Sequence, residues 1–522
     1  MQLKLEEMTL DQKLGMVLCA RRFYEDDIEY ILEMIKNRSL GCVQLPAWNR
    51  DVCDRILSAI DYPVLVINDT EMGFPTSDLP KIPLISLAAC NKKEYYQAFA
   101  KGIVHDAKKA GFNGTWGPVI DILFADGPAR VHRVFSNDPV KVSEAAEVIA
   151  SIYRKNGYLS TGKHYPGAHD CPFDTHMTEG YSERTEEELK NFELVPYMYL
   201  HKKGLLPAIM TGHTVCRKID PEYPASLSKK VIDIIRQMGF DGLCFTDSFA
   251  MMGILQKYGE ENIYGMAIAA GNDLVLPNYN SSVKDCFERL KKNYLDGAFT
   301  EQRLNEAVRR VLGAQSFVSA PPEDPTAFTE KDRQLLYDVA RDCVTAVTAE
   351  GVTAALPKDQ KSRLFVILTS NQFDPGRSGA RDDREIDVAP WYFPERIADK
   401  IGEVFPDAGI EYLPEFSNQA DHIRILNAAT HYQEVVFVTF CATVCYLGTD
   451  GLTRRTESVI NALIHSEKVS AIAHFGNPFA LKNLLPVPRK IFGYMIPESQ
   501  IHAIDVLAGN LEAKGKLPFN ID

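Results

Sequence analysis

Residues 228–247 read SKKVIDIIRQMGFDGLCFTD, and this stretch joins a helical pattern to a buried strand that ends in an aspartate. Residues 228–238 have the apolar period of an amphipathic helix, whereas Gly242–Thr246 is a short apolar run typical of a buried strand. Alternation of helices and such strands is the pattern of a parallel α/β sheet. We therefore expect an α/β fold in which Asp247 directly follows the carboxyl end of a strand.

The same unit recurs through the first 316 residues. Seven further apolar runs are expected to form strands: Leu14–Ala20, Gly41–Leu45, Val64–Ile67, Thr115–Ile120, Leu159–His164, Pro207–Thr211 and Asn272–Leu276. Helical periodicity fills the intervals, at about residues 26–38, 96–110, 138–155, 185–203 and 300–316. Eight β/α alternations predict a (β/α)₈ barrel of the TIM type. An open doubly wound sheet is the competing interpretation.

A proline-rich stretch separates this region from a second one. Ser319–Pro325 holds three prolines in seven residues and cannot continue a regular element. After it the α/β pattern resumes, with strand-like runs at Leu364–Leu368, Val435–Phe440 and Val469–Phe475. We predict a barrel over residues 1–316, a linker over 317–329 and a smaller α/β sandwich domain over 330–522.

Composition narrows the class of protein. The chain has 522 residues and a formal net charge of -13, which argues against nucleic acid or an anionic membrane as its partner. It has no apolar stretch long enough to span a membrane. The 11 cysteines show neither Cys-x-x-Cys pairs nor zinc spacing, so we expect buried free thiols and a cytoplasmic location. No cofactor or metal is expected.

Polar residues end five of the expected strands. A barrel carries its active site at the carboxyl ends of its strands, where these residues would meet. A capping role is the simplest interpretation of any one of them. Together they describe a carboxylate-rich pocket with a cationic corner, suited to a neutral polyhydroxylated ligand. The residues are Asp69, Asp121, Lys163 with His164, His213 and Asp247.

The segment from Lys163 to His176 reads KHYPGAHDCPFDTH and holds one lysine, three histidines and two aspartates. Metal binding is one interpretation, although the helical spacing of common metal motifs is absent. The alternative is a catalytic pair, Asp174 and His176, in a loop. A carboxylate beside an imidazole fixes its tautomer and stabilises its cation, so that His176 can exchange a proton near neutral pH.

The segment resembles the Lys-His-Phe-Pro-Gly-His-Gly…Asp-Ser-His signature of glycoside hydrolase family 3, in its β-N-acetylhexosaminidase branch. Further motifs that are similar to those of the family occur along nearly the whole chain. They include Ala208–His213, Pro224–Ser228, Gly239–Met251, Gly117–Asp121, Arg133–Phe135, Asp69-x-Glu-x-Gly73 and the closing run Ala508–Pro518.

The resemblance implies a retaining β-glycosidase that hydrolyses terminal β-N-acetylhexosaminides, β-GlcNAc foremost. Asp247 would be the nucleophile, His176 the acid/base, and Asp174 the residue that orients it. The residues implied to bind the sugar are Asp69, Asp121, Arg133, Lys163 and His164.

The chain departs from the family pattern at three places. Gly167-Ala-His169 stands for Gly-His-Gly, Asp69-Thr-Glu-Met-Gly-Phe74 lacks the usual arginine, and Ser248 replaces an aspartate after the nucleophile. These changes leave other activities open. They are a β-N-acetylglucosaminide phosphorylase or β-glucosidase of the same family, a non-catalytic sugar-binding protein, and a Schiff-base aldolase that uses Lys163.

Overall fold

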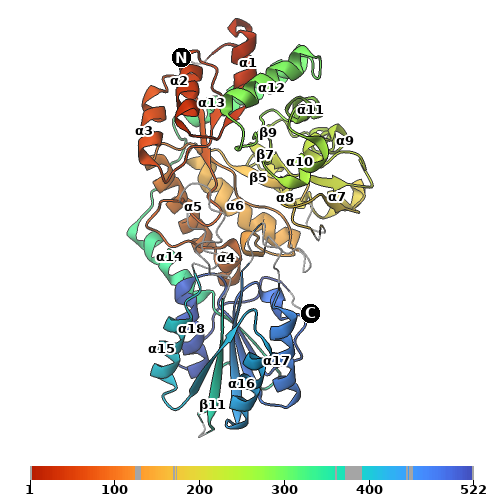
Figure 1. Ribbon diagram of the computed structural model, residues 1–522. Helices are drawn as coiled ribbons and strands as arrows, with labels where there is room; N and C mark the ends of the chain where they lie inside the picture. The colour runs from red at the N-terminus through yellow and green to blue at the C-terminus, as the bar shows by residue number, and fades with distance from the viewer. Residues whose placement is uncertain are drawn as a thin grey trace. The chain divides into compact units, whose positions relative to one another are not determined.

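The computed structural model describes residues 3–123, 131–167, 171, 173–358, 361–370, 391–442, 445 and 451–519. The chain forms two compact units (Figure 1). The first comprises Met1–Pro80, Tyr96–Gly127 and Val134–Arg333, and the second comprises Lys81–Tyr95, Pro128–Arg133 and Gln334–Asp522.

Parallel strands form the centre of the first unit. One sheet has the order β1–β2–β3–β4 and another the order β5–β7–β9. Single parallel bridges extend this pairing: Gly114 to Leu159, Phe245 to Leu274 and Leu18 to Val275. The bounds are β1 Cys19–Ala20, β2 Cys42–Val43, β3 Leu65–Asn68, β4 Gly114–Thr115, β5 Thr161–Tyr165, β7 Ala208–Thr211 and β9 Leu243–Thr246. A separate parallel pair consists of β6 Gly180–Ser182 and β8 Thr214–Cys216.

Helices connect these strands, as the sequence pattern predicted. They are α1 Leu10–Met16, α2 Glu25–Lys36, α3 Arg50–Ala59, α5 Lys93–Lys109, α6 Pro139–Lys155, α7 Glu186–Asn191, α8 Val195–Lys202, α9 Lys229–Gln237, α10 Met252–Tyr258, α11 Ile263–Ala270, α12 Val283–Leu295 and α13 Glu301–Ser319. Short 3₁₀ helices lie at η1 Leu5–Glu7 and η3 Ala225–Leu227. The expected strand at Leu14–Ala20 is wrong in its first half. Thr9 and Gln12 form a capping box that starts α1, and only Cys19 and Ala20 are extended.

The stretch 228–247 folds as predicted. Ser228 caps α9 by accepting a hydrogen bond from the backbone N–H of Val231, and the helix buries an isoleucine and valine face. Gly239 follows with φ of 93°, a left-handed conformation that glycine adopts without a steric penalty. The chain then enters β9, whose four residues are buried. Asp247 is therefore placed by a capped helix and a buried strand.

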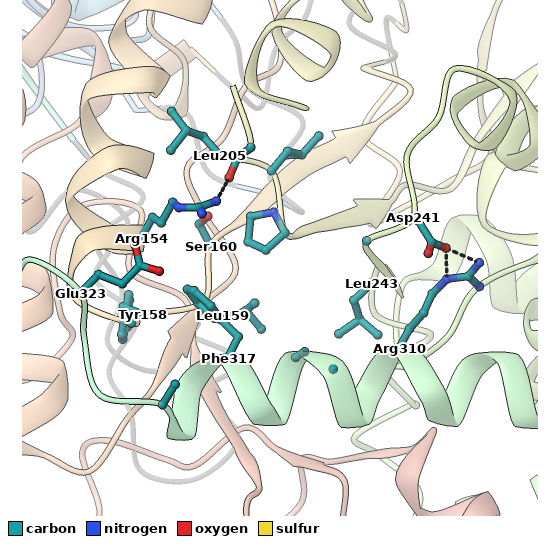
Figure 2. A pocket seen from close by; sticks show the side chains of 18 of the residues that line it. Arg154, Tyr158, Leu159, Ser160, Leu205, Asp241, Leu243, Arg310, Phe317 and Glu323 are labelled. Atoms are coloured by element: carbon teal, nitrogen blue, oxygen red, sulfur yellow. Dashed lines mark hydrogen bonds and ion pairs between the residues drawn. The ribbon is translucent and has the colours of Figure 1, made fainter. Parts of the chain in front are cut away.

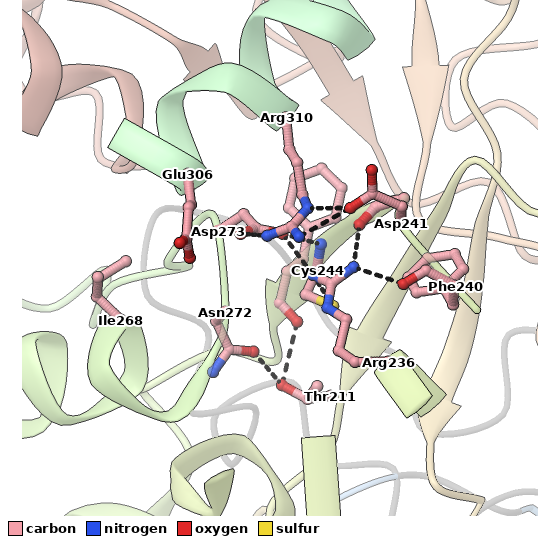
Figure 3. A network of polar contacts seen from close by, with 12 residues as sticks. Thr211, Arg236, Phe240, Asp241, Cys244, Ile268, Asn272, Asp273, Glu306 and Arg310 are labelled. Atoms are coloured by element: carbon pink, nitrogen blue, oxygen red, sulfur yellow. Dashed lines mark hydrogen bonds and ion pairs between the residues drawn. The ribbon is translucent and has the colours of Figure 1, made fainter. Parts of the chain in front are cut away.

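A buried carboxylate ties two helices to the amino-terminal side of these strands (Figure 3). Asp273 is fully buried and accepts from Arg236 of α9 at 2.8 Å and from Arg303 and Arg310 of α13 at 2.6 and 3.1 Å. It also accepts from the backbone N–H of Cys244 at 3.0 Å. This network fixes the starting point of β9, whose far end carries Asp247.

The second unit is built on a six-stranded sheet of order β10–β15–β14–β13–β11–β12. The strands are parallel except for the β10–β15 pair. Helices α15 and α18 lie on one face, and α16 and α17 on the other (Figure 1). The bounds are β10 Thr345–Thr348, β11 Arg363–Thr369, β12 Gly409–Pro414, β13 Glu434–Cys441, β14 Val469–Gly476, β15 Arg489–Phe492, α15 Pro394–Val404, α16 Gln419–Thr430, α17 Arg454–His465 and α18 Pro497–Ala508. Helices α4 Leu84–Cys90, η2 Val131–Arg133 and η4 Pro478–Leu481 also belong here, and α14 Glu330–Asp342 begins in the first unit.

All 11 cysteines are free thiols, and ten of them are buried, as expected. Within the described ranges, the structure contains no helix with the length and apolar character needed to cross a membrane.

Candidate active site

The predicted strand-end residues of the first unit gather at the carboxyl ends of β3, β5, β7 and β9. Asp247 follows β9, and its backbone N–H donates to the carbonyl of Thr211 at the end of β7, at 2.8 Å. His164, in β5, has its Nε2 4.0 Å from Oδ2 of Asp247. The structure therefore brings the predicted nucleophile and a predicted sugar-binding residue together.

Asp247 lies in an environment that favours its charged form. Burial acts to raise the pKa of its carboxyl group, but His164, His213, His176 and the Ser248 backbone N–H outweigh burial, so that the pKa is lowered far below its ordinary value. His213 contributes little at neutral pH, because burial lowers the pKa of its own imidazole and leaves it uncharged. The other groups that lower the pKa of Asp247 are His164, His176 and the Ser248 backbone N–H. The result is an ionised carboxylate, as a nucleophile requires.

Asp121 supports His164. Its Oδ2 lies 2.7 Å from Nδ1 of His164, and its Oδ1 accepts from the His164 backbone N–H at 2.8 Å. Asp121 is buried, so the pair is shielded from water. The arrangement directs Nε2 of His164 toward Asp247 and stabilises the imidazolium.

Lys163 is held between two carboxylates. Its Nζ lies 2.7 Å from Asp69 and 2.5 Å from Glu71, and the side chain is buried. Glu71 was not among the predicted site residues. Its place in the motif Asp69-x-Glu-x-Gly73, next to a predicted ligand, was the signal that could have identified it.

The Asp174 and His176 pair is present in the loop after β5. Nδ1 of His176 lies 2.8 Å from Oδ1 of Asp174, which also accepts from the His176 backbone N–H at 3.0 Å. With Nδ1 donating to the carboxylate, Nε2 is the nitrogen that exchanges protons with a ligand. Asp174 is nearly buried, whereas His176 is partly exposed.

Backbone hydrogen bonds attach this loop to the segment that follows Asp247. The N–H of Met252 donates to the carbonyl of His176 at 3.0 Å, and the N–H of Gly253 donates to that of Thr175 at 3.2 Å. Gly253 is required for this approach, since a Cβ there would lie 2.4 Å from the carbonyl oxygen of Thr178. The imidazole and the predicted nucleophile are thus positioned by one connected piece of backbone.

His213 supports the site by contacting the backbone of the residue after Asp247. It is buried, with Nδ1 2.8 Å from the Ser226 hydroxyl and Nε2 3.0 Å from the carbonyl of Ser248. A neutral imidazole that donates from Nε2 fixes the backbone directly after Asp247.

Two residues named in the sequence analysis lie outside the part of the first unit described above. Arg133 ends η2, which groups with the second unit. His169 lies outside the described residues.

A cavity of about 490 Å³ occupies the other end of the strands (Figure 2). It is lined by residues that precede or begin β5, β7 and β9, such as Leu159, Pro207 and Leu243, and by Arg310 of α13, which is paired with Asp241. The predicted catalytic residues are absent from its lining. Its volume alone does not make it the active site.

Comparison with known proteins gives a consistent result. The model of the glycosyl hydrolase family 3 N terminal domain matches residues 9–314, more than half of the chain. A β-N-acetylglucosaminidase/β-glucosidase from Cellulomonas fimi is 24% identical over 414 residues, which are 72% of this chain and 71% of that protein. A β-hexosaminidase from Chromobacterium violaceum is 33% identical over 168 residues, 32% of this chain and 46% of the relative.

Solved structures share the fold. A family 3 β-N-acetylglucosaminidase from Paenibacillus sp. str. FPU-7 matches with a TM-score of 0.79 at 22% identity, covering 98% of this chain and 99% of the other. A β-glucoside phosphorylase matches with a TM-score of 0.79 at 20% identity, covering 99% and 95%. The family model decides the assignment: this chain belongs to glycoside hydrolase family 3.

Proposed function

We propose that this protein is a retaining β-N-acetylhexosaminidase that removes terminal β-GlcNAc through a covalent intermediate on Asp247. The observation that carries the proposal is the pairing of an ionised strand-end carboxylate with an Asp174–His176 dyad whose loop is hydrogen-bonded to the same segment. Retaining glycosidases need a carboxylate nucleophile and a proton donor on the leaving-group side. Relatives named β-N-acetylglucosaminidase/β-glucosidase and β-hexosaminidase support the choice of sugar.

In the first half-reaction, a carboxylate oxygen of Asp247 attacks the anomeric carbon. The bond to the leaving oxygen breaks, and His176 gives that oxygen the proton from Nε2. Asp174 stabilises the imidazolium before transfer. In the second half-reaction, His176 takes a proton from water, whose oxygen attacks the anomeric carbon and releases the Asp247 carboxylate.

The first sugar subsite is proposed to contain Asp69, Asp121, Lys163, His164 and Arg133. Carboxylate and ammonium groups match the acceptor and donor capacity of sugar hydroxyls. The position of Lys163 between Asp69 and Glu71 supports this role, because the two carboxylates hold its Nζ in place. Asp121 contributes indirectly, because its hydrogen bond to His164 holds that imidazole in place.

The architecture proposed for this activity is a closed (β/α)₈ barrel over residues 1–316, a linker over 317–329 and an α/β sandwich over 330–522. The bridge between Leu18 and Val275 supports closure, since it joins the first and eighth strand positions. Helix α13 ends at Ser319, close to the proposed boundary. We also propose a cytoplasmic location, which the free thiols favour.

A second candidate function is phosphorolysis, with phosphate as the acceptor. An uncharged imidazole base repels an incoming anion less than a carboxylate base does. One protein of the same fold is a β-glucoside phosphorylase. Incubation with and without millimolar phosphate distinguishes the two, because phosphorolysis yields the sugar 1-phosphate whereas hydrolysis yields the free sugar.

The proposed nucleophile is tested by labelling. A 2-deoxy-2-fluoro β-glycosyl fluoride should leave its sugar on Asp247, located by mass spectrometry of peptides. His176→Ala should lose most activity on substrates with poor leaving groups and least on aryl glycosides with acidic phenols. A label on another carboxylate, or equal losses on all leaving groups, would contradict the respective assignment.

A further inference from the structure

Arg21 is a partly buried cation whose guanidinium has unmet hydrogen-bonding capacity. It directly follows β1, and its Nε and Nη1 atoms are buried without a hydrogen-bond partner among the described residues. Its contacts are with aromatic rings, Trp116 at 5.7 Å and Tyr279 at 5.3 Å. Buried guanidinium groups in proteins are normally paired, because the loss of water is otherwise uncompensated. An exception at a strand end indicates a missing ligand.

Two other arginine side chains of the first unit have carboxylate partners. Arg22, the next residue, pairs with Asp27 at 3.3 Å. Arg236 pairs with Asp273 at 2.8 Å. Both of these arginines also contact an aromatic ring. Arg21 differs from them because it has no carboxylate partner in the described part of the chain.

Two more buried polar atoms without partners lie on strand ends of the same sheet. They are Oε1 of Gln44, after β2, and Nε1 of Trp116, after β4. Ala20 pairs with Val43, and the Gln44 backbone N–H donates to the Ala20 carbonyl at 2.9 Å. Arg21 and Gln44 therefore occupy equivalent positions and present their side chains to the same face. We call Arg21, Gln44, Trp116 and Tyr279 the Arg21 cluster.

The Arg21 cluster adjoins the proposed sugar site. The Trp116 backbone N–H donates to the carbonyl of Asn68, the residue before Asp69, at 3.3 Å. The Trp116 ring lies 6.3 Å from that of Phe245, two residues before Asp247. Tyr279 follows the segment whose Leu276 carbonyl accepts from the N–H of Phe249. The cluster thus shares its supporting strands with Asp69 and Asp247.

The unmet groups define the chemistry of the ligand. The guanidinium and the indole are donors, and a guanidinium binds oxyanions through two parallel, charge-assisted hydrogen bonds. Gln44 offers an acceptor, suited to a hydroxyl. We propose that the Arg21 cluster is a subsite for an oxyanion, a phosphate ester or carboxylate, carried by the hexosaminide substrate.

This inference rests on the proposed function, and it adds that anionic β-N-acetylhexosaminides are preferred to neutral ones. The probes are 4-nitrophenyl β-N-acetylglucosaminide and its 6-phosphate. The ratio of their kcat/KM values should favour the phosphate in the wild type, and Arg21→Met should lower this ratio about tenfold or more. Arg22→Gln is the matched control, and it should leave the ratio unchanged.

Binding is measured separately from turnover. Calorimetry should show that N-acetylglucosamine 6-phosphate binds more tightly than N-acetylglucosamine, and Arg21→Met should remove this difference. If neither substrate is hydrolysed but the binding difference remains, the proposed activity fails and the subsite stands. Inorganic phosphate is then added as a competitor. If it does not weaken binding of N-acetylglucosamine 6-phosphate, the phosphate group is recognised only as part of the sugar. If inorganic phosphate does compete, and Arg21→Met abolishes the competition, the Arg21 cluster also binds free phosphate.

Three results would overturn the subsite: a wild-type enzyme without preference for the phosphate, equal losses on both substrates in Arg21→Met, or an equal fall of the ratio in Arg22→Gln. Thermal unfolding of both variants excludes misfolding as the cause. Arg21→Lys provides a second variant, which keeps the charge and should retain part of the preference.

Discussion

Asp247 keeps its charge in a position where burial alone would neutralise it. The opposing attraction of the nearby histidines decides the outcome, and His164 is the first of them because its Nε2 lies 4.0 Å from the carboxylate. Asp121 in turn holds His164 in place. The reactivity proposed for Asp247 as nucleophile thus depends on a residue that the resemblance assigns to sugar binding.

Replacing His164 by Gln should raise the pKa of Asp247 toward its ordinary value of 3.8. A higher pKa means that the carboxylate is protonated, and the nucleophile lost, at a higher pH. The measurement is the pH dependence of inactivation by the 2-fluoro glycosyl fluoride, whose leaving group needs little acid assistance.

In the wild type, the inactivation rate should stay level down to about pH 4, whereas in the variant it should already fall near that pH. His201→Gln, at the opposite end of the strands, is the control. An unchanged profile in His164→Gln would show that His164 does not stabilise the ionised nucleophile.

The residues of the site were predicted unevenly from sequence. Asp247 and Asp121 could be placed because each directly follows an apolar run, and Lys163 and His164 because they end one. Glu71 had a local signal, its place in the motif beside Asp69, that was not used, whereas Arg21 could not be identified because its significance lies in distances between different strands. Arg21 in particular has no local pattern to mark it.

At the scale of elements, backbone hydrogen bonds join the loop after β5 to the start of α10. Their two backbone hydrogen bonds require a residue without a side chain at position 253, since a Cβ would lie 2.6 Å from the Thr175 carbonyl oxygen. The geometry of the Asp174–His176 dyad therefore depends on a glycine outside the loop.

Gly253→Ala should displace the loop and lower kcat/KM about ten- to hundredfold, because small displacements of the proposed proton donor, His176, are costly. Activity on aryl glycosides with acidic phenols should fall less, since they depend less on His176. Gly313→Ala is the control, because its Cβ would meet open space. Full activity in Gly253→Ala would mean that the loop tolerates the added atom.

The ion-pair network around Asp273 joins helices α9 and α13 to the start of β9. Replacing Asp273 by Ala leaves three arginines without their shared buried carboxylate, and unfolding free energy should fall by about 3–5 kcal/mol. Asp233→Ala, which removes an exposed pair with Lys229 on the same helix, should change it by about 0.5 kcal/mol or less. Urea unfolding measures both. Similar losses in the two variants would contradict a special role for Asp273.

Element prediction succeeded where periodicity was unambiguous. The amphipathic pattern at 228–238 and the run at Gly242–Thr246 became α9 and β9. The run at Leu14–Ala20 failed because a short apolar segment fits a buried helix turn as well as a strand. The capping box at Thr9 was the local signal that favoured the helix.

At the scale of the whole molecule, pH dependence of stability should come partly from the second unit. Burial raises the pKa of Glu415 to about 7 and lowers that of His474 to about 4. Between pH 4.5 and 7 the unfolded chain has released the Glu415 proton while the folded chain retains it, so stability falls as pH rises. His474 acts in the opposite direction between pH 4 and 6.5, where only the unfolded chain is protonated.

Glu415→Gln isolates the first effect. At pH 8 the variant should be more stable than the wild type by about 3 kcal/mol, because the wild type must bury a charge there. The difference should shrink toward pH 5, where Glu415 is protonated in the folded chain. Unfolding curves at several pH values provide the measurement. A difference that is independent of pH would show that Glu415 does not titrate as proposed.

The attachment of the Asp174–His176 loop through main-chain groups has a consequence for how this lineage can diverge. The backbone N–H groups of Met252 and Gly253 donate to the carbonyl oxygens of His176 and Thr175, so these hydrogen bonds do not depend on which side chains the loop residues carry. Side-chain changes at most loop positions therefore leave the anchoring intact, whereas a side chain at position 253 would collide with the loop backbone. New substrate preferences can evolve on this loop while the inherited chemistry persists.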